Sequence, residues 1–155
     1  MDERFEVQRT IPADPSVIFD VVSSPTGHVA IDASGMLQSA DGDAAHAVGD
    51  TFVIHMDREA LGDLPMGKYD VTVTITAYEQ DAFITWEVSG PGFPSIGHYY
   101  GYRLERVDGG TLVTSIYDWS AVDEKWKPDG TWPIVPEFAL KATLGILERT
   151  VASRL

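Results

Sequence analysis

The chain has 155 residues, 44% of them hydrophobic and none of them cysteine, which is typical of one globular domain with an ordinary core. Its formal net charge is −13, because 24 acidic residues outweigh 11 basic ones. An acidic surface repels nucleic acids and anionic membranes, so neither is an expected partner. Without cysteine there is no disulfide framework, zinc–thiolate site or thiolate nucleophile.

The first residues are charged and no apolar run follows them, unlike a secretory leader. No stretch approaches the roughly 20 apolar residues that a spanning helix needs. We therefore expect a cytoplasmic protein and treat residues 1–155 as a single domain.

The first third of the chain predicts a strand, one or two short helices and a second strand. Residues 5–11 alternate between apolar and polar side chains, as a half-buried strand does. Asp14 is a good helix N-cap and Pro15 suits the first helical position, so a short helix is expected next. Residues 26–35 have room for another short helix, and residues 36–40 begin a strand.

The middle of the chain predicts consecutive antiparallel strands joined by polar turns. Alternating or β-prone stretches recur there, with turn-forming residues between them. They span residues 51–57, 68–78, 82–89, 98–107 and 111–119. Asp108-Gly109-Gly110 is a hairpin signal between the last two stretches.

The last part of the chain predicts a long loop and then a helix. Residues 120–135 contain two tryptophans and two prolines and are expected to form the loop. From Pro136 onward an apolar stripe has helical spacing. It consists of Leu140, Leu144, Leu147 and Val151, with Phe138 and Ala142 beside it. A run of strands followed by a helix favours an α+β architecture.

Several stretches of the chain resemble a known superfamily. They are residues 10–19, residues 24–28 with their proline and histidine, residues 100–105 with 109–114, and the terminal helix behind its loop. These stretches resemble the strand-to-helix entry, the segment after the first helix, the last hairpin and the final helix of SRPBCC proteins. That superfamily includes START lipid-transfer domains and pollen-allergen-like proteins, and the polyketide cyclase/dehydrase-like group is the most similar branch.

The resemblance implies a helix-grip fold: a curved antiparallel sheet of about six to seven strands wrapped around a long C-terminal helix, enclosing an apolar pocket. The superfamily has no shared catalytic motif, so the resemblance assigns no catalytic residue. It also assigns no metal and no cofactor, and we expect neither.

Candidate pocket residues follow from the strand alternation and the helix stripe. They are Phe52, Ile54, Val73, Ile75, Trp86, Tyr100, Tyr102 and Tyr117 on the sheet, with Leu140 and Leu144 on the helix. The same residues could instead pack as a solid core. Alternation also places Tyr100 and Tyr102 on one face and Tyr99 on the other. A buried tyrosine hydroxyl needs a partner, which is either a ligand or a backbone carbonyl.

Three tryptophans precede the last helix. Trp126 and Trp132 could form a lid over the pocket, or could anchor the loop or a dimer contact, and Trp119 belongs to the same cluster. The sequence leaves monomer and homodimer equally open.

The histidines offer weaker signals. His28 and Asp32 are four residues apart, which would suit a metal pair or an acid–base pair, but no third zinc ligand is evident. His55 and Asp57 alternate onto one face of a strand. We interpret these histidines as exposed or hydrogen-bonded rather than as ligands.

Three functions remain after motif analysis. The chain has no Gly-x-Ser-x-Gly elbow and no phosphate-binding glycine loop. Binding of a small apolar or aromatic molecule is the favoured function, with a polyketide cyclase or dehydratase and a co-chaperone-like interaction module as alternatives. Any acid–base chemistry would fall on Tyr100, Tyr102, His98 or Asp118.

Overall fold

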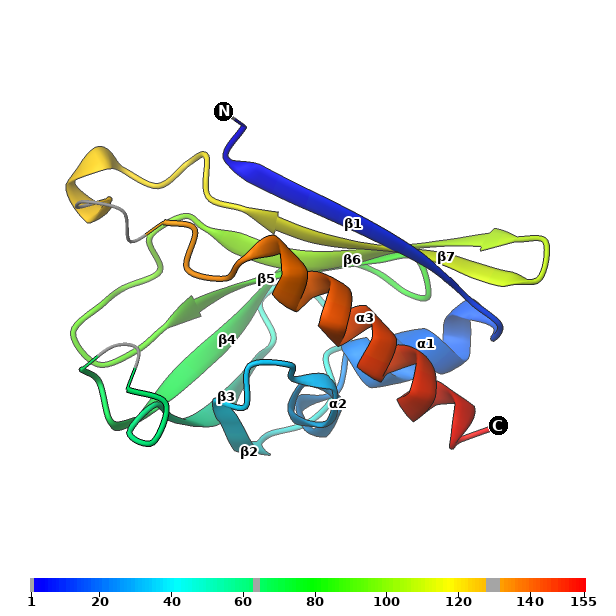
Figure 1. The fold of residues 1–155 in the computed structure, drawn as a ribbon, viewed down its shortest axis with the longest axis horizontal. Helices are drawn as coiled ribbons and strands as arrows, with labels where there is room; N and C mark the ends of the chain where they lie inside the picture. The colour runs from blue at the N-terminus through cyan, green and yellow to red at the C-terminus, as the bar shows by residue number, and fades with distance from the viewer. Residues whose placement is uncertain (1, 63–64, 128–131) are drawn as a thin grey trace.

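The computed structural model describes residues 2–62, 65–127 and 132–155. In these ranges, seven strands form one sheet and three α-helices pack on it (Figure 1). The strands are β1 (Arg4–Ile11), β2 (Leu37–Asp41), β3 (Thr51–Asp57), β4 (Lys68–Glu79), β5 (Phe83–Ser89), β6 (Tyr99–Val107) and β7 (Gly110–Asp118). The helices are α1 (Pro15–Val22), α2 (Pro25–Ile31) and α3 (Glu137–Ala152).

The sheet is antiparallel throughout, in the order β1-β7-β6-β5-β4-β3-β2. Strands β2 to β7 are neighbours in sequence order, whereas β1 returns to pair with β7. Their register places Arg4 opposite Asp118 and Ile11 opposite Thr111. The first and last strands are therefore neighbours, and β1 and β2 are the two edges.

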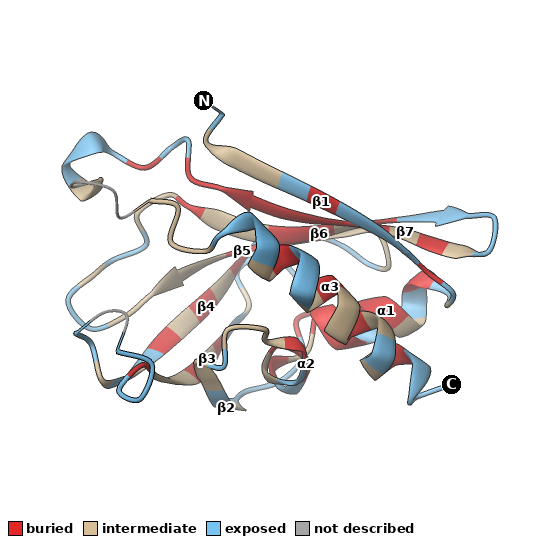
Figure 2. Cartoon of the chain, in the orientation of Figure 1, coloured by how far each residue is buried: buried red, intermediate tan, exposed pale blue. Residues whose placement is uncertain are grey.

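The three helices share one face of the sheet, and α3 crosses it obliquely (Figure 1). Helix α3 contacts β1, β7, α1 and α2. Its apolar stripe of Leu140, Leu144, Leu147 and Val151 is buried, as Figure 2 shows by the red segments along α3. These observations confirm the predicted α+β helix-grip architecture with two short helices after the first strand. In the described part of the chain, no helix has the length and hydropathy needed to cross a bilayer.

Two register shifts contribute to the curvature of the sheet. One lies in β4 between Ile75 and Ala77, and the other lies in β2 between Leu37 and Ser39. An extra residue in one strand bends it and increases its twist. The sheet thereby curls around the helical layer, and space remains between the two.

The first two helices touch at the level of their backbones. Gly27 of α2 lies against α1 so closely that a Cβ atom at this position would overlap the backbone oxygen of Val21. The Ser24 hydroxyl caps α2 by accepting a hydrogen bond from the Gly27 amide at 3.4 Å. This contact places the next residue, His28, beneath the sheet.

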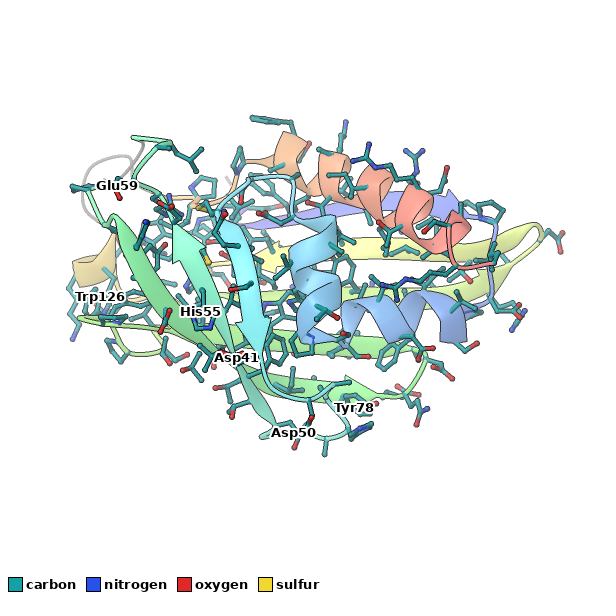
Figure 3. The ribbon with its side chains drawn as sticks, turned by 90° about the horizontal axis from the view of Figure 1, so that it is seen from below. Asp41, Asp50, His55, Glu59, Tyr78 and Trp126 are labelled. Carbon is teal, nitrogen blue, oxygen red and sulfur yellow. The ribbon has the colours of Figure 1, made fainter. Side chains whose placement is uncertain are left out.

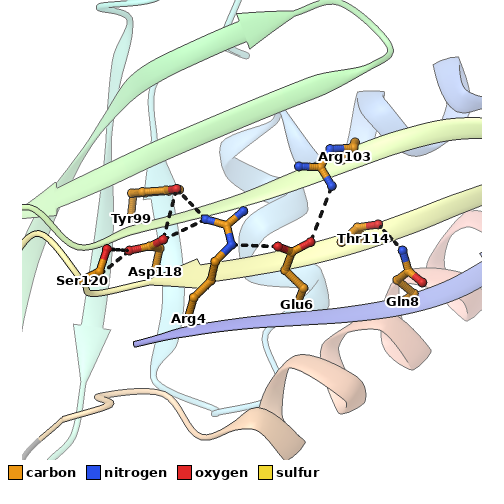
Figure 4. Close-up of polar contacts among 8 residues, drawn as sticks. All are labelled: Arg4, Glu6, Gln8, Tyr99, Arg103, Thr114, Asp118 and Ser120. Atoms are coloured by element: carbon orange, nitrogen blue, oxygen red, sulfur yellow. Dashed lines mark hydrogen bonds and ion pairs between the residues drawn. The ribbon is translucent and has the colours of Figure 1, made fainter. Parts of the chain in front are cut away.

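A polar network covers the opposite face of the sheet where β1, β7 and β6 meet (Figure 4). Arg4 donates to Asp118 at 2.8 Å, to the Tyr99 hydroxyl at 2.7 Å and to Glu6 at 2.8 Å. Ser120 donates to Asp118 from both its amide and its hydroxyl. Tyr99 thus points away from Tyr100 and Tyr102, as the alternation predicts.

Helix α1 begins as predicted, with Asp14 at the N-cap and Pro15 in the first turn. The Asp14 side chain makes no cap bond, however, and accepts from Arg106 at 2.9 Å. Phe138 is 73% exposed and Ala142 is also exposed. Each lies two residues from Leu140, which is about 200° around a helix and hence on the opposite face.

Two other boundaries differ from the prediction. Helix α2 ends at Ile31 rather than near residue 35, because the Asp32 carboxylate accepts hydrogen bonds from the amides of Ser34 and Leu37 and starts a turn. The loop before α3 contains a short 3-10 helix, η1 (Glu124–Trp126).

Candidate functional site

A cavity of about 340 Å³ lies between the sheet and the helical layer. Such a volume is within the range of small-molecule sites in proteins. Residues of α2, α3 and all strands except β1 line it, together with Trp132, Ile134 and Val135 before α3 and loop residues that include Asp32 and Arg58. Most of these side chains are apolar or aromatic. The cavity therefore has the position that the helix-grip resemblance implies.

The predicted pocket residues divide into two groups. Those that line the cavity are Ile54, Val73, Trp86, Tyr100, Tyr102 and Leu140. Those that are buried outside it are Phe52, Ile75, Tyr117 and Leu144. The contact of either group with a ligand stays a prediction.

Each of the four outer residues has a physical reason for its place. Leu144 is one helical turn beyond Leu140. The Phe52 ring packs edge-on against His28, whose ring occupies the wall instead. Tyr117 stacks behind Tyr100, with ring centroids 4.4 Å apart. Ile75 precedes the β4 register shift and is fully enclosed.

Trp86 is the centre of the aromatic wall. Cross-strand pairing places it opposite Tyr100, and its ring is 6.0 Å from that of Tyr100 and 5.8 Å from that of Tyr102. On the other side, the His28 ring from α2 lies 4.5 Å away. Side chains from two strands and a helix thus meet around one indole, which links the sheet to the helical layer.

His28 is a cavity residue that the sequence prediction missed. Its side chain is buried, and Nε2 donates a hydrogen bond to the backbone oxygen of Val22 at 2.7 Å. Burial lowers the pKa of His28 to about 4, so the ring is neutral at neutral pH. The proton of the neutral ring is on Nε2, because a carbonyl oxygen can only accept.

His28 and Asp32 do not act as a pair. The Asp32 carboxylate is engaged by Ser34 and Leu37, whereas the His28 ring bonds to Val22. This agrees with the hydrogen-bonded interpretation of His28 and with neither the metal pair nor the acid–base pair.

His98 also lines the cavity; it was named as a possible acid–base group but not as a wall residue. It shares a face with Tyr100 and Tyr102 because the three are spaced two residues apart. His98 Nδ1 lies 3.0 Å from the Tyr117 hydroxyl. Burial lowers the pKa of His98 to about 4 and raises the pKa of Tyr100 to about 12. Burial, followed by the nearby Tyr100 hydroxyl, also raises the pKa of Tyr117. All these groups are therefore neutral at neutral pH.

Three polar atoms on the wall have free hydrogen-bonding capacity. Among the described residues, His28 Nδ1, His98 Nε2 and the Tyr102 hydroxyl have no hydrogen-bond partner. No fully enclosed side-chain nitrogen or oxygen in the described ranges lacks a partner, so these atoms must touch open space. All three residues line the cavity, and the cavity is that space.

The tryptophans before α3 have different roles. Trp132 lines the cavity, packs edge-on against His98 at 4.8 Å and donates from its indole to the Trp126 backbone oxygen at 2.6 Å. Trp126 lies outside the wall, half-buried, at the far end of the molecule from Tyr78 (Figure 3). Trp119 is buried between Phe5 and Tyr117. A lid made of Trp126 and Trp132 stays a prediction.

His55 lies away from the cavity. It alternates with Ile54 on β3, and its ring bridges Asp41 of β2 and Asp70 of β4 at 2.7 Å each; Figure 3 shows it beside Asp41. Asp57, which was expected on the same face of the strand, takes no part in this bridge. Hydrogen bonding, first to Asp41 and then to Asp70, raises the pKa of His55. Since carboxylates only accept, both ring nitrogens carry protons in this arrangement.

Comparison with known proteins identifies the fold. No family model matches the sequence, and no curated protein matches it. Protein CV1439 from Chromobacterium violaceum is similar in structure, with a TM-score of 0.69 at 12% identity over 97% of this chain and 98% of that chain. An AHSA1-like protein from Aeromonas hydrophila has a TM-score of 0.65 at 14% identity, over 97% of this chain and 93% of that chain.

A third similar structure is DynU16, a protein of the dynemicin biosynthetic locus, with a TM-score of 0.65 at 14% identity. The match covers 99% of this chain and 48% of DynU16. Identities this low define the fold alone. The chain shares its fold with these proteins, and it is the helix-grip fold that the sequence resemblance implies.

Proposed function

We propose that this chain binds a small apolar or aromatic molecule in the cavity between its sheet and α3. The observation that carries the proposal is a cavity of about 340 Å³ whose wall is mostly apolar and aromatic, with a few polar side chains that include the charged Asp32 and Arg58. Apolar walls reward the burial of an apolar ligand, at about 25 cal/mol per Å² of area removed from water. The polar atoms then orient the ligand.

An acid–base enzyme is the second candidate, because His98, Tyr117 and Tyr100 lie together at the cavity wall. A cyclase or dehydratase would draw on such groups. However, burial lowers the pKa of His98 to about 4 and raises that of Tyr100 to about 12. Both values are far from the neutral range in which proton transfer is most effective, so these groups support binding better than catalysis.

The interaction module has less support. Among the described residues, the exposed large apolar side chains come from separate segments of the chain. They are Val48, Leu61, Met66, Val107, Phe138 and Leu155. Single exposed apolar residues are common on soluble proteins and do not define a docking patch.

The test is a titration with the neutral fluorescent probe N-phenyl-1-naphthylamine. Wild-type protein is expected to bind it. Trp86→Ala and Tyr102→Ala should abolish that binding, and Val73→Phe should do so by filling the cavity. Tyr99→Phe, on the opposite face of the sheet, is the matched control. Thermal unfolding of every variant separates lost binding from lost folding. A wild-type protein that binds no probe, or a Val73→Phe variant that binds it unchanged, would overturn the proposal.

A further inference from the structure

The His28 side chain presents a hydrogen-bond acceptor to the cavity. Its Nε2 proton is committed to the Val22 oxygen at 2.7 Å, which leaves a lone pair on Nδ1 of the neutral ring. No described residue donates to Nδ1, and the atom reaches open space at the cavity wall. A ligand group placed there must donate a hydrogen to be satisfied.

The Tyr102 hydroxyl belongs to a second cavity-lining residue whose ring lies beside Trp86. It makes no hydrogen bond with a described residue, and burial, followed by the charge of Asp32, raises the pKa of Tyr102. It is therefore neutral and free to donate. The rings of His28 and Tyr102 both flank the Trp86 indole, at centroid distances of 4.5 Å and 5.8 Å. One acceptor and one donor thus border the same aromatic surface.

A hydroxyl group satisfies both atoms, because it donates one hydrogen and accepts another. We propose that the cavity recognises the hydroxyl of a neutral alcohol or phenol with an apolar body, in which this hydroxyl donates to His28 Nδ1 and accepts from Tyr102. This inference rests on the proposed binding function and specifies the class of ligand.

Other oxygen groups fit this pair less well. A ketone or an ether accepts from Tyr102 but cannot donate, so it leaves His28 Nδ1 buried without a partner, which is unfavourable. A carboxylate cannot donate to His28 Nδ1 either, and it loses its hydration on entry. The cavity lining holds one charge of each sign, Asp32 and Arg58, so the affinity of an acid is not set by this pair alone. The wall therefore discriminates among oxygen groups on one skeleton.

The experiment compares five ligands of one skeleton by isothermal titration calorimetry with the full chain at pH 7. They are tetralin, α-tetralol, α-tetralone, the methyl ether of α-tetralol and the corresponding carboxylic acid. We expect α-tetralol to bind about tenfold more tightly than α-tetralone and the ether. One neutral hydrogen bond, together with a partner for the otherwise unpaired acceptor His28 Nδ1, changes affinity by about that factor.

Two variants test whether His28 and Tyr102 cause the preference for α-tetralol. In Tyr102→Phe, α-tetralol should lose about threefold to tenfold in affinity while tetralin is unchanged. In His28→Phe, the ratio between α-tetralol and α-tetralone should fall to about one. His28→Phe also leaves the Val22 oxygen without its hydrogen-bond donor, and this variant could fail to fold. In that case the wild-type affinities for α-tetralol, the ether and the ketone still test whether the ligand must donate a hydrogen. Tyr99→Phe is the control.

The outcomes separate the two proposals. If none of the five compounds binds, and N-phenyl-1-naphthylamine does not bind, the binding function itself fails. If tetralin, the ketone or the ether binds as tightly as α-tetralol, the cavity is a binding site but hydroxyl recognition is wrong. A tenfold preference that survives in both Tyr102→Phe and His28→Phe would also overturn the inference.

Discussion

The Nε2 atom of His28 donates its hydrogen to the backbone oxygen of Val22, 2.7 Å away, so one imidazole ring joins the end of α1 to α2 and forms part of the cavity wall. The same bond fixes which ring nitrogen faces the cavity. The position of the two short helices and the chemistry of the site are therefore coupled. A change that moves α2 relative to α1 should alter both stability and binding.

Stability should fall as the pH drops from about 6.5 to about 4. The pKa of His28 and that of His98 are each lowered by burial from 6.5 to about 4, so the unfolded chain binds more protons than the native chain in this window. Their contribution is fully present above pH 6.5 and is lost as the pH approaches 4. Each histidine accounts for about 3 kcal/mol.

Urea unfolding at pH 7 and pH 4.5 measures this effect. His98→Leu should show a shallower pH dependence than the wild type. His55→Gln should not flatten the curve in this way, because the pKa of His55 is raised, and its contribution is present below pH 6.5 and lost as the pH rises. A wild-type protein equally stable at both pH values would contradict the prediction.

Gly27→Ala should destabilise the protein by about 3 kcal/mol or more, because the new methyl group would overlap the backbone oxygen of Val21 and force α2 away from α1. Gly145→Ala is the matched control within α3, where no atom beyond the neighbouring residues and the local helix backbone lies within 4 Å of the added methyl. That change should stabilise the protein by about 1 kcal/mol through helix propensity. Thermal unfolding of both variants tests this prediction. Equal changes in unfolding temperature for Gly27→Ala and Gly145→Ala would contradict it.

Arg4→Ala should cost about 2 kcal/mol, because it removes hydrogen bonds to Asp118, Tyr99 and Glu6 at the edge of the sheet (Figure 4). Burial alone would raise the pKa of Asp118, but hydrogen bonds from Ser120 and Arg4 outweigh it and hold that pKa below its usual value.

Arg9→Ala is the comparison on the same strand. Arg9 pairs with Glu148 at 3.1 Å, and both side chains are about a third exposed or more. Such exposed pairs contribute little, so the loss should stay below about 1 kcal/mol. Chemical denaturation of the two variants in low salt provides the test, and equal losses would show that the Arg4 network adds nothing to an ordinary surface pair.

The bridge across β2, β3 and β4 predicts an effect visible by NMR. Asp41→Asn should lower the pKa of His55 towards its ordinary value, because the Asp41 hydrogen bond is the largest cause of the raised pKa. Asp57→Asn, on the same strand but outside the bridge, should leave the His55 titration where it is. A His55 pKa that moves as much in Asp57→Asn as in Asp41→Asn would place the interaction elsewhere.

Local patterns were sufficient to predict the order of the strands and helices. The alternation around Tyr99, Tyr100 and Tyr102 assigns the two faces of β6 correctly, because successive side chains of a strand point to opposite faces of the sheet. The stripe from Leu140 to Val151 identifies the buried face of α3 in the same way. These signals are short-range, and a single sequence contains them.

The wall of the cavity depends on contacts between distant segments. Nothing near His28 in the sequence indicates that its ring will reach Trp86, some 60 residues later; that contact follows from the α1–α2 packing and the bend of the sheet. Tyr117 was predicted in the wall and lies behind it, since stacking on Tyr100 depends on the register between two strands. Asp14 takes the predicted N-cap position, but its carboxylate pairs with the distant Arg106 and not with the helix.

The pairing of β1 with β7 determines when the sheet can be completed during synthesis. Arg4 is synthesised more than 100 residues before its partner Asp118. Until β7 is made, β1 has a free edge that can pair with other nascent chains. Helix α3 packs on both strands and follows them in the sequence, so the cavity can take shape only after α3 has been made.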